Sequence, residues 1–417
     1  MISNKVAIIG GGASGLFAAC RLVQLGVVPT VFEKNQLLGM KLGITGKGRC
    51  NLTNNCSTSE FLENVMTNHK FLYSSINRFS PSDTMAFFEG LGIPLKTERG
   101  NRVFPVSDKA TDVVLGMKNF IVSNGCKIIN ETVTELVSED KKVTGIRTEK
   151  KLYTGFEFVL LCTGGVSYPR TGSTGDGYRF ASSLGHTIIK PTPSLVPFEC
   201  YEKSCREMMG LSLRNTKVEI VDNNTKKIVY NDFGEVLFTH FGLSGPVILS
   251  ASTHISGMEP KRYSVVLDLK PALDYDTLDR RVLSDFGKYI NKSVSNAMKD
   301  LLPSTMIIPF IEYCGIDRDK KVNSVTQQER KAIVTGLKSY TFTIKGFRPI
   351  EEAIVTRGGI SVNEINPVTM KSKICSNLYF AGEIIDVDAY TGGFSLQIAF
   401  STSNAASESI AQELQNN

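Results

Sequence analysis

The strongest constraint on the fold lies at the start of the chain. An apolar, β-branched run over 5–9 predicts a buried parallel strand, and a helix is predicted over 16–25. Between them, Gly10, Gly12 and Gly15 fit the spacing G-x-G-x-x-G. These glycines permit a tight turn, a close approach of backbone to a pyrophosphate, and close packing of helix on sheet. We therefore predict that a dinucleotide binds here, with its pyrophosphate at the helix N-terminus.

An acidic residue closes the second strand of this unit, which is predicted over 29–32. Glu33 stands 18 residues after Gly15, where it can accept hydrogen bonds from an adenosine ribose. A carboxylate there would repel a 2′-phosphate, which favours FAD or NAD over NADP. Two alternatives are weaker. The chain start imitates a secretion signal, but the glycines interrupt its apolar run, and a glycine-rich turn of another α/β protein lacks the terminal acid.

Composition narrows the class of protein. The 417 residues are 41% hydrophobic and 21% charged, with a net charge of +6 and no long basic block. Nine cysteines form no C-x-x-C pair, and four histidines show no metal-ligand spacing. No run approaches 18 apolar residues. We expect a cytoplasmic protein that acts on a small molecule, with free thiols, no metal, and neither a nucleic-acid nor a membrane partner. The oligomeric state stays open.

Two later segments decide between FAD and NAD. Residues 127–162 predict a small meander that returns into the main sheet and ends in a small-residue turn. Near the C-terminus, a strand over 378–381 ends in Gly382-Glu383, and Gly392-Gly393 opens a helix. These segments resemble those of FAD enzymes of the glutathione-reductase type, in which such a helix directs its positive end at the pyrimidine edge of the flavin. The positive end would stabilise the anionic reduced form of the flavin. Three segments in this chain order favour FAD: the first glycine turn, the small-residue turn after the meander, and the C-terminal strand with its helix.

The middle of the chain has a different character. It is strand-rich over 194–271 and helical over 274–338, and the predicted FAD segments flank it. We therefore predict an α/β fold in which a Rossmann-like FAD-binding domain carries an insertion that covers the flavin. The predicted boundaries are 1–192 and 345–417 for the FAD domain, 193–272 and 339–344 for a β-rich domain, and 273–338 for a helical subdomain.

Nearly the whole chain resembles a known family. The motifs GMKLGITGKGRCNLTN, RVFPVSDKA, TGGVSYPRTGSTGDGY, GEVLFTHFGLSGPVIL, RPIEEAIVTRGGI and YFAGEIIDVDAYTGGFSLQIA carry the resemblance. They are similar to those of the bacterial BaiN-like, aminoacetone-oxidase-like NAD(P)/FAD-dependent oxidoreductases, whose FAD domain is of the glutathione-reductase type. The resemblance implies that the insertion is a β-barrel-like domain with a helical subdomain. Met40 and Lys47 depart from the family pattern in a loop expected to wrap the cofactor.

The predicted cofactor site draws on all these segments. In the loop over 39–54, Lys41 and Arg49 would neutralise phosphate charge, and Asn51 would hydrogen-bond the flavin or its ribityl chain. The alternative for this loop is a flexible basic surface segment. The full set expected to contact FAD is Gly10, Gly12, Ala13, Ser14, Gly15, Glu33, Lys34, Lys41, Gly46, Arg49, Cys50, Asn51, Val133, Thr163, Gly164, Gly165, Gly382, Glu383, Gly392, Gly393 and Phe394.

The predicted chemistry is hydride transfer between FAD and a small organic substrate. No second G-x-G-x-x-G appears, so NAD(P)H would act as a transient reductant. His240 and Tyr168 are the candidate catalytic residues, although each also suits a structural role in a turn or loop. Arg170 and Arg357 are further candidates for the cavity. Two alternatives stay open: an oxygen-dependent oxidase of a small amine, and a flavoprotein that binds RNA or a protein with a non-catalytic flavin.

Overall fold

A computed structural model describes residues 2–255 and 257–416, and it divides into two compact units. The first unit joins Met1–Ser194 to Ile350–Asn417, and the second is Leu195–Pro349. The two ends of the chain therefore build one unit, and both the strand-rich and the helical middle segments belong to the other. Within the described residues, no helix has the length and the apolar character needed to cross a membrane.

A five-stranded parallel sheet forms the centre of the first unit, in the order β20-β11-β1-β2-β7. The apolar strand interiors are buried on both faces, as expected for a parallel sheet covered by helices. The segment 127–130 was expected to begin the meander. It instead pairs in parallel with β2, because Ile128 and Ile129 pack against the central core. The strands are β1 (Ile2–Ile9), β2 (Val27–Glu33), β7 (Lys127–Asn130), β11 (Phe158–Leu161) and β20 (Leu378–Phe380).

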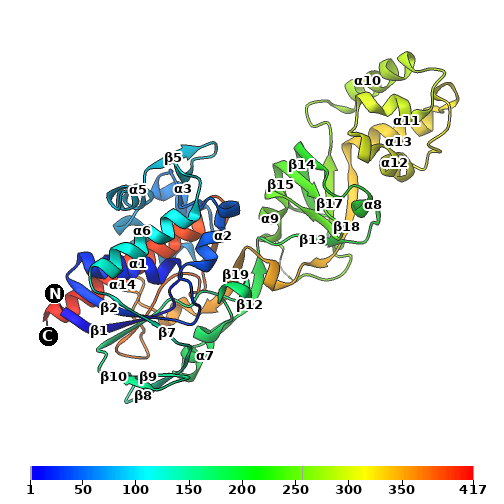
Figure 1. The fold of residues 1–417 in the computed structure, drawn as a ribbon. Coiled ribbons are helices and arrows are strands. Elements are labelled where there is room, and N and C mark those ends of the chain that lie inside the picture. The colour runs from blue at the N-terminus through cyan, green and yellow to red at the C-terminus, as the bar shows by residue number, and fades with distance from the viewer. Residues whose placement is uncertain (1, 256, 417) are drawn as a thin grey trace. The chain divides into compact units, whose positions relative to one another are not determined.

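Three helices gather over one face of this sheet: α1 (Ala13–Gln24), α6 (Ala110–Ser123) and α14 (Phe394–Asn416) (Figure 1). Small residues let α1 and α14 approach closely. Ser403 Oγ donates to the carbonyl of Ser14 at 3.0 Å, and most of α14 is buried. The C-terminal helix is therefore part of the core beside the first turn of α1.

A separate antiparallel meander consists of β8 (Val133–Glu139), β9 (Lys142–Thr148) and β10 (Leu152–Thr154). The buried side chain of Asn377 fastens it to the main sheet. Its Oδ1 accepts from the Val143 amide at 2.8 Å, and its Nδ2 donates to the carbonyls of Val143 and Glu157. One amide group thus satisfies backbone atoms of the meander and of Glu157, the residue before β11.

Short elements complete the first unit, and α2 among them carries Lys41 and Gly46 of the residues predicted to bind the cofactor. They are α2 (Met40–Gly48), β3 (Thr53–Asn54), α3 (Thr58–Glu63), β4 (Val65–Thr67), η1 (His69–Leu72), α4 (Tyr73–Arg78), α5 (Pro81–Gly90), β5 (Leu95–Glu98), β6 (Arg102–Pro105), η2 (Pro169–Thr171), α7 (Asp176–Ser183), β12 (Ile188–Ser194), η5 (Ile350–Glu352), β19 (Val355–Ile360), η6 (Val362–Glu364) and β21 (Asp388–Ala389).

The second unit contains a closed six-stranded barrel, in the order β13-β16-β15-β14-β17-β18, which confirms the predicted β-barrel-like domain. Its alternating strands point apolar side chains at a separate hydrophobic core. The strands are β13 (Phe198–Cys200), β14 (Ser212–Asp222), β15 (Ile228–Phe238), β16 (Gly242–Ser244), β17 (Tyr263–Asp268) and β18 (Tyr340–Phe347). The helices of this unit are α8 (Ser204–Glu207), α9 (Pro246–Ser252), α10 (Tyr275–Lys288), α11 (Val294–Ala297), η3 (Met298–Asp300), α12 (Ser304–Tyr313), η4 (Val322–Ser324) and α13 (Gln327–Lys338).

A buried histidine braces the end of the first unit. His186 Nε2 lies 2.8 Å from Ser372 Oγ, and its Nδ1 lies 3.2 Å from Glu364 Oε2. Although this order of groups resembles a Ser-His-acid triad, Ser372 Oγ also accepts from the amides of Ile374 and Cys375. The serine is committed to a turn, so the trio is structural.

This histidine predicts a pH dependence of stability. Burial lowers the pKa of His186, against the opposing charge of Glu364. Below about pH 6.5 the unfolded chain takes up a proton that the folded chain resists, so stability falls as the pH falls. The expected contribution to the slope is up to about 1.4 kcal/mol per pH unit. Urea unfolding at pH 7 and pH 5 measures it. The loss should be smaller in His186→Gln, and an equal loss in both proteins contradicts the assignment.

Candidate functional site

The turn between β1 and α1 requires glycine at two positions for steric reasons. Gly10 has φ +102°, and a Cβ there would lie 2.6 Å from the carbonyl oxygen of Cys162, the residue after β11. A Cβ on Gly15 would lie 1.8 Å from the carbonyl oxygen of Gly10. Neither position has room for a side chain, so both glycines serve the fold of the turn itself.

Gly12 is different. Its φ of −80° suits any residue, and a Cβ there would meet nothing within 4 Å. It is the N-cap of α1 but provides no side-chain cap, so the first amides of the helix, including those of Ala13 and Ser14, have no capping oxygen. The fold does not need glycine here, whereas a phosphate approaching the helix N-terminus does. This open space lined with amide donors fits a pyrophosphate.

Glu33 is held firmly at the end of β2. It is only 8% exposed, its Oε2 accepts from the Gly11 amide at 2.7 Å, and its Oε1 accepts from the Asn35 amide at 2.8 Å. The carboxylate is therefore fixed beside the glycine turn, in the place where an adenosine ribose is expected. The neighbouring Lys34 pairs with Asp176 at 2.7 Å, so its charge is already matched within the protein.

A polar network surrounds the small-residue turn after β11 and the Gly382-Glu383 segment. Glu383 Oε2 accepts from Lys41 Nζ at 2.7 Å, and its Oε1 accepts from the Thr356 amide at 2.8 Å. Ser167 Oγ lies within hydrogen-bond distance of both Lys41 and Glu383. The tertiary structure thus brings Lys41 and Glu383 together, and adds two residues that the sequence analysis missed, Ser167 and Thr356.

The Thr163-Gly164-Gly165 turn lies against the same network. A Cβ on Gly165 would approach Thr356 Oγ1 to 2.4 Å, and Gly164 has φ +70°. Thr163 Oγ1 is buried and has no hydrogen-bond partner among the described residues. On the opposing side, a Cβ on Gly382 would lie 2.0 Å from Ser14 Oγ of α1. The glycine turn before α1, the turn after β11 and the Gly382-Glu383 segment are therefore adjacent in space.

The loop after β2 is less regular than a helix. The helical backbone of α2 is interrupted at Thr45, Gly46 and Lys47, the last two of which have positive φ. Asn51 Oδ1 is buried without a hydrogen-bond partner among the described residues, which is what a missing donor from a bound ligand would leave. Burial raises the pKa of the Cys50 thiol to about 12, so this cysteine is neutral and contributes no thiolate.

Arg49 already has two anionic partners. Its guanidinium donates to Glu98 and to Asp108 Oδ1 and lies over the ring of Phe104, with 4.1 Å from Cζ to the ring centroid. Hydrogen bonds from Arg49, and from Lys96 to Asp108, lower the pKa of both carboxyls. A contact of Arg49 with phosphate therefore stays a prediction, and the protein itself supplies a full set of partners.

The start of α14 is fixed by close backbone packing. Gly393 has φ +102°, and a Cβ there would lie 2.3 Å from the carbonyl oxygen of Thr53. Asn54 Nδ2 donates to the Gly392 carbonyl at 3.1 Å, and Phe394 packs its ring against Phe61. The predicted flavin-facing helix end is thus built against β3. Val133, the residue predicted in the meander, is buried in β8 within the core of this unit.

The two predicted catalytic residues lie in different units. Tyr168 belongs to the first unit, has φ +53°, and burial followed by the charge of Glu352 raises the pKa of its phenol. His240 belongs to the second unit and is exposed, with its ring edge-on to Phe241. From the sequence FGLSGP, Ser244 is the expected cap of the helix after it, but the N-cap is Gly245, at φ +102°, and Ser244 lies in β16.

A group of polar residues surrounds the loop between Glu383 and Gly392, and of these the sequence analysis selected only Arg357, as a candidate for the cavity. Asp388 is 2% exposed, and its Oδ2 accepts from Ser194 Oγ at 2.7 Å and from Arg357 Nε at 3.3 Å. Asp386 accepts from Asn68 Nδ2 at 3.0 Å. Burial raises the pKa of Asp386, and the charge of Asp388 adds to this effect. Asp386 and Asp388 stand in the middle of the motif GEIIDVDAYTGG. Only the ends of this motif, Gly382-Glu383 and Gly392-Gly393, matched a pattern of FAD-binding proteins.

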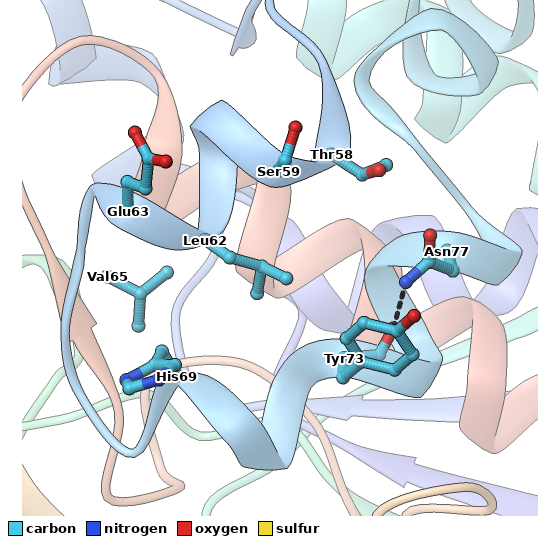
Figure 2. A pocket seen from close by; sticks show the side chains of 8 residues that line it. All are labelled: Thr58, Ser59, Leu62, Glu63, Val65, His69, Tyr73 and Asn77. Atoms are coloured by element: carbon cyan, nitrogen blue, oxygen red, sulfur yellow. Dashed lines mark hydrogen bonds between the residues drawn. The ribbon is translucent and has the colours of Figure 1, made fainter.

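A surface pocket lies apart from the residues that are predicted to bind the cofactor. It has a volume of about 480 Å³ and is formed by α3, β4, η1 and α4 (Figure 2). Figure 2 shows Leu62, His69 and Tyr73 around the opening, and Asn77 Nδ2 donates to the Tyr73 carbonyl at 2.8 Å. None of the residues predicted to bind the cofactor lines this pocket. The pocket adjoins the loop between Glu383 and Gly392 through β4, which pairs with β21 of that loop.

Comparisons with known proteins agree with this geometry. Residues 4–409 match the family model described as HI0933-like protein Rossmann domain. The chain is 30% identical over 412 residues to a ribosomal RNA dihydrouridine synthase of Haemophilus influenzae, covering 97% of this chain and 98% of the relative. It is 27% identical over 413 residues to a 3-dehydro-bile acid Δ(4,6)-reductase of Clostridium scindens, covering 98% and 99%.

A solved structure shares the fold. The 3-ketosteroid Δ1-dehydrogenase of Sterolibacterium denitrificans superposes with a TM-score of 0.52 at 14% identity, covering 99% of this chain and 100% of the other. At this level of identity, the match supports the architecture of both units and carries no information about the substrate.

Proposed function

Because the chain belongs to the HI0933-like family of FAD-binding Rossmann oxidoreductases, we propose that it reduces a carbon–carbon double bond conjugated to a carbonyl group, with NAD(P)H as the reductant. The observation that carries the proposal is the pair of full-length relatives. A dihydrouridine synthase saturates the C5=C6 bond of a uracil, and the bile acid reductase saturates bonds conjugated to a ketone. Both bonds are electron-poor at the carbon β to the carbonyl.

The residues of the first unit fit FAD. The open N-terminus of α1 beside Gly12 would hold the pyrophosphate, Glu33 the adenosine ribose, and Glu383 the ribityl chain. The unpartnered Asn51 Oδ1 would accept a hydrogen bond from the cofactor. When bound, FAD supplies hydride transfer, which no side chain of the protein can perform.

The reaction also needs a proton for the carbon α to the carbonyl. Tyr168 follows the Thr163–Gly165 turn, and its raised pKa keeps the phenol protonated at neutral pH. We assign it the role of proton donor. Hydride and proton together saturate the double bond, and NAD(P)H is oxidised to NAD(P)⁺ in each cycle.

The more similar relative favours one substrate. The dihydrouridine synthase is 30% identical to this chain and covers nearly all of it, which supports a uracil base in ribosomal RNA as the substrate. This competes with our expectation from composition that nucleic acid is not a partner, since the net charge of +6 lies in no long basic block. An enone such as a 3-ketosteroid is the other candidate.

Anaerobic kinetics tests the proposal. The purified protein should show the absorbance of bound flavin, which NADH or NADPH should bleach. Uracil-containing ribosomal RNA or an enone should then restore the colour, with the saturated product detected by mass spectrometry. Tyr168→Phe should slow product formation at least about tenfold and leave the FAD dissociation constant unchanged. Rapid bleaching by aminoacetone-like amines, without any reoxidation by either substrate, would instead identify an amine oxidase.

A further inference from the structure

One buried carboxylate oxygen, near the helix start that is predicted to face the flavin, has no hydrogen-bond donor among the described residues. Asp388 Oδ1 is fully buried and makes no hydrogen bond within the described residues. The other carboxylate oxygen is held by Ser194 and Arg357, so the group cannot rotate to satisfy Oδ1 without losing one of these bonds. An unsatisfied buried carboxylate oxygen is costly, which points to a donor that a ligand supplies.

The position of this oxygen identifies the region it serves. Asp388 lies in the loop that joins Gly382-Glu383 to Gly392-Gly393, the two segments assigned to opposite ends of the flavin part of FAD. β19 runs beside this loop, since the Ile360 amide donates to the Ile384 carbonyl at 2.9 Å and the Asp386 amide donates to the Ile360 carbonyl. β21 pairs Asp388 with Thr67 of β4 on the other side. The loop is therefore fixed in place, and Oδ1 is a preorganised acceptor.

The chemistry of an ionised, immobile acceptor selects an acidic N–H donor. A cyclic imide, in which N–H stands between two carbonyl groups, is such a donor, and the charge-assisted hydrogen bond to a carboxylate is strong. We propose that Asp388 Oδ1 accepts the imide N–H of a pyrimidine ring, with Arg357 and Ser194 as the residues that position the carboxylate. The inference rests on the proposed function, because two imides belong to it: the N3–H of the flavin and the N3–H of a uracil substrate. A 3-ketosteroid ring has no such donor.

Asp388→Asn tests the proposal in the full-length protein, because it keeps the shape and removes the charged acceptor. Its matched control is Asp222→Asn in the second unit. Asp222 is also buried and also paired with an arginine, at 3.4 Å from Arg262 Nε, but both of its oxygens have partners. The readouts are the dissociation constants of FAD and of N3-methyl-FAD, and kcat/KM for uridine RNA, N3-methyluridine RNA and an enone without an N–H group.

The effects on FAD binding and on kcat/KM together identify whether the imide belongs to the flavin or to the uracil. If it is the uracil, Asp388→Asn lowers kcat/KM for uridine RNA at least about tenfold and spares both the enone and FAD binding, and the wild type rejects N3-methyluridine. If it is the flavin, the dissociation constant of FAD rises about tenfold, and N3-methylation weakens binding to the wild type only. Changes within about twofold of the control in every readout overturn the proposal. If the wild type binds FAD but saturates no double bond, the proposed function fails, and the two FAD titrations alone decide the role of Asp388.

Discussion

Gly12→Val should abolish FAD binding while the protein stays folded. A Cβ at this position meets no protein atom within 4 Å, and the backbone conformation suits any residue. The added side chain enters the space assigned to the pyrophosphate and covers the amides of α1. The dissociation constant of FAD should rise at least about 100-fold, or roughly 2.7 kcal/mol, whereas the poorer N-cap should cost about 1 kcal/mol of stability or less.

Flavin fluorescence titration and thermal unfolding of the apoprotein measure the two effects. Gly287→Val is the matched control, because this glycine of α10 also has open space at its Cβ and lies in the other unit. It should bind FAD like the wild type. Gly15→Ala is the contrast: its Cβ would overlap the Gly10 carbonyl, so it should unfold at a lower temperature. Normal FAD affinity in Gly12→Val would remove the basis for placing the pyrophosphate at this helix.

Gln397→Leu should produce the largest loss of stability among single substitutions in α14. The side chain is fully buried, and its Oε1 accepts from Thr53 Oγ1 at 2.6 Å and from Thr84 Oγ1 at 2.8 Å. Its Nε2 donates to the carbonyl of Phe79 and to Ser401. Leucine would leave the hydroxyls of Thr53 and Thr84 without their acceptor in the core, whereas Ser401 Oγ still donates to the Phe79 carbonyl. We expect a cost of about 3 kcal/mol.

This glutamine also positions the predicted flavin end. It lies one turn after Gly393, and Thr53 forms the surface on which Gly393 packs. We therefore expect weaker FAD binding together with the lower midpoint of urea unfolding. Gln412→Leu is the control on the same helix, because Gln412 is exposed and should change the unfolding midpoint little. Equal midpoints for the two variants would show that the buried network does not brace the site.

Prediction from sequence succeeded where local pattern and chemistry coincide. The glycine spacing after the first strand, with Glu33 at the end of the second, predicts a Rossmann-type unit, and the parallel sheet is present. The barrel, which the family resemblance implies, is present as well. The same reasoning misplaced 127–130, because a short alternating run does not reveal which sheet it will join. The contact of Arg49 with phosphate stays a prediction, and the sequence did not reveal its partners Glu98 and Asp108, which are 49 and 59 residues away in the chain.

The sequence by itself determined the class of fold and the kind of cofactor, because each rests on patterns within short segments of the chain. The tertiary structure separated the glycines that the fold requires from Gly12, because the atoms that a Cβ would meet at Gly10 and Gly393 belong to distant segments. Only the tertiary structure decided which polar groups meet. Ser167, Thr356 and Glu383 come together from three distant segments, and Asp388 is left with one unsatisfied oxygen because Ser194 and Arg357 hold the other. Pairing across such separations is set by how the sheet and helices pack, and no local spacing encodes it.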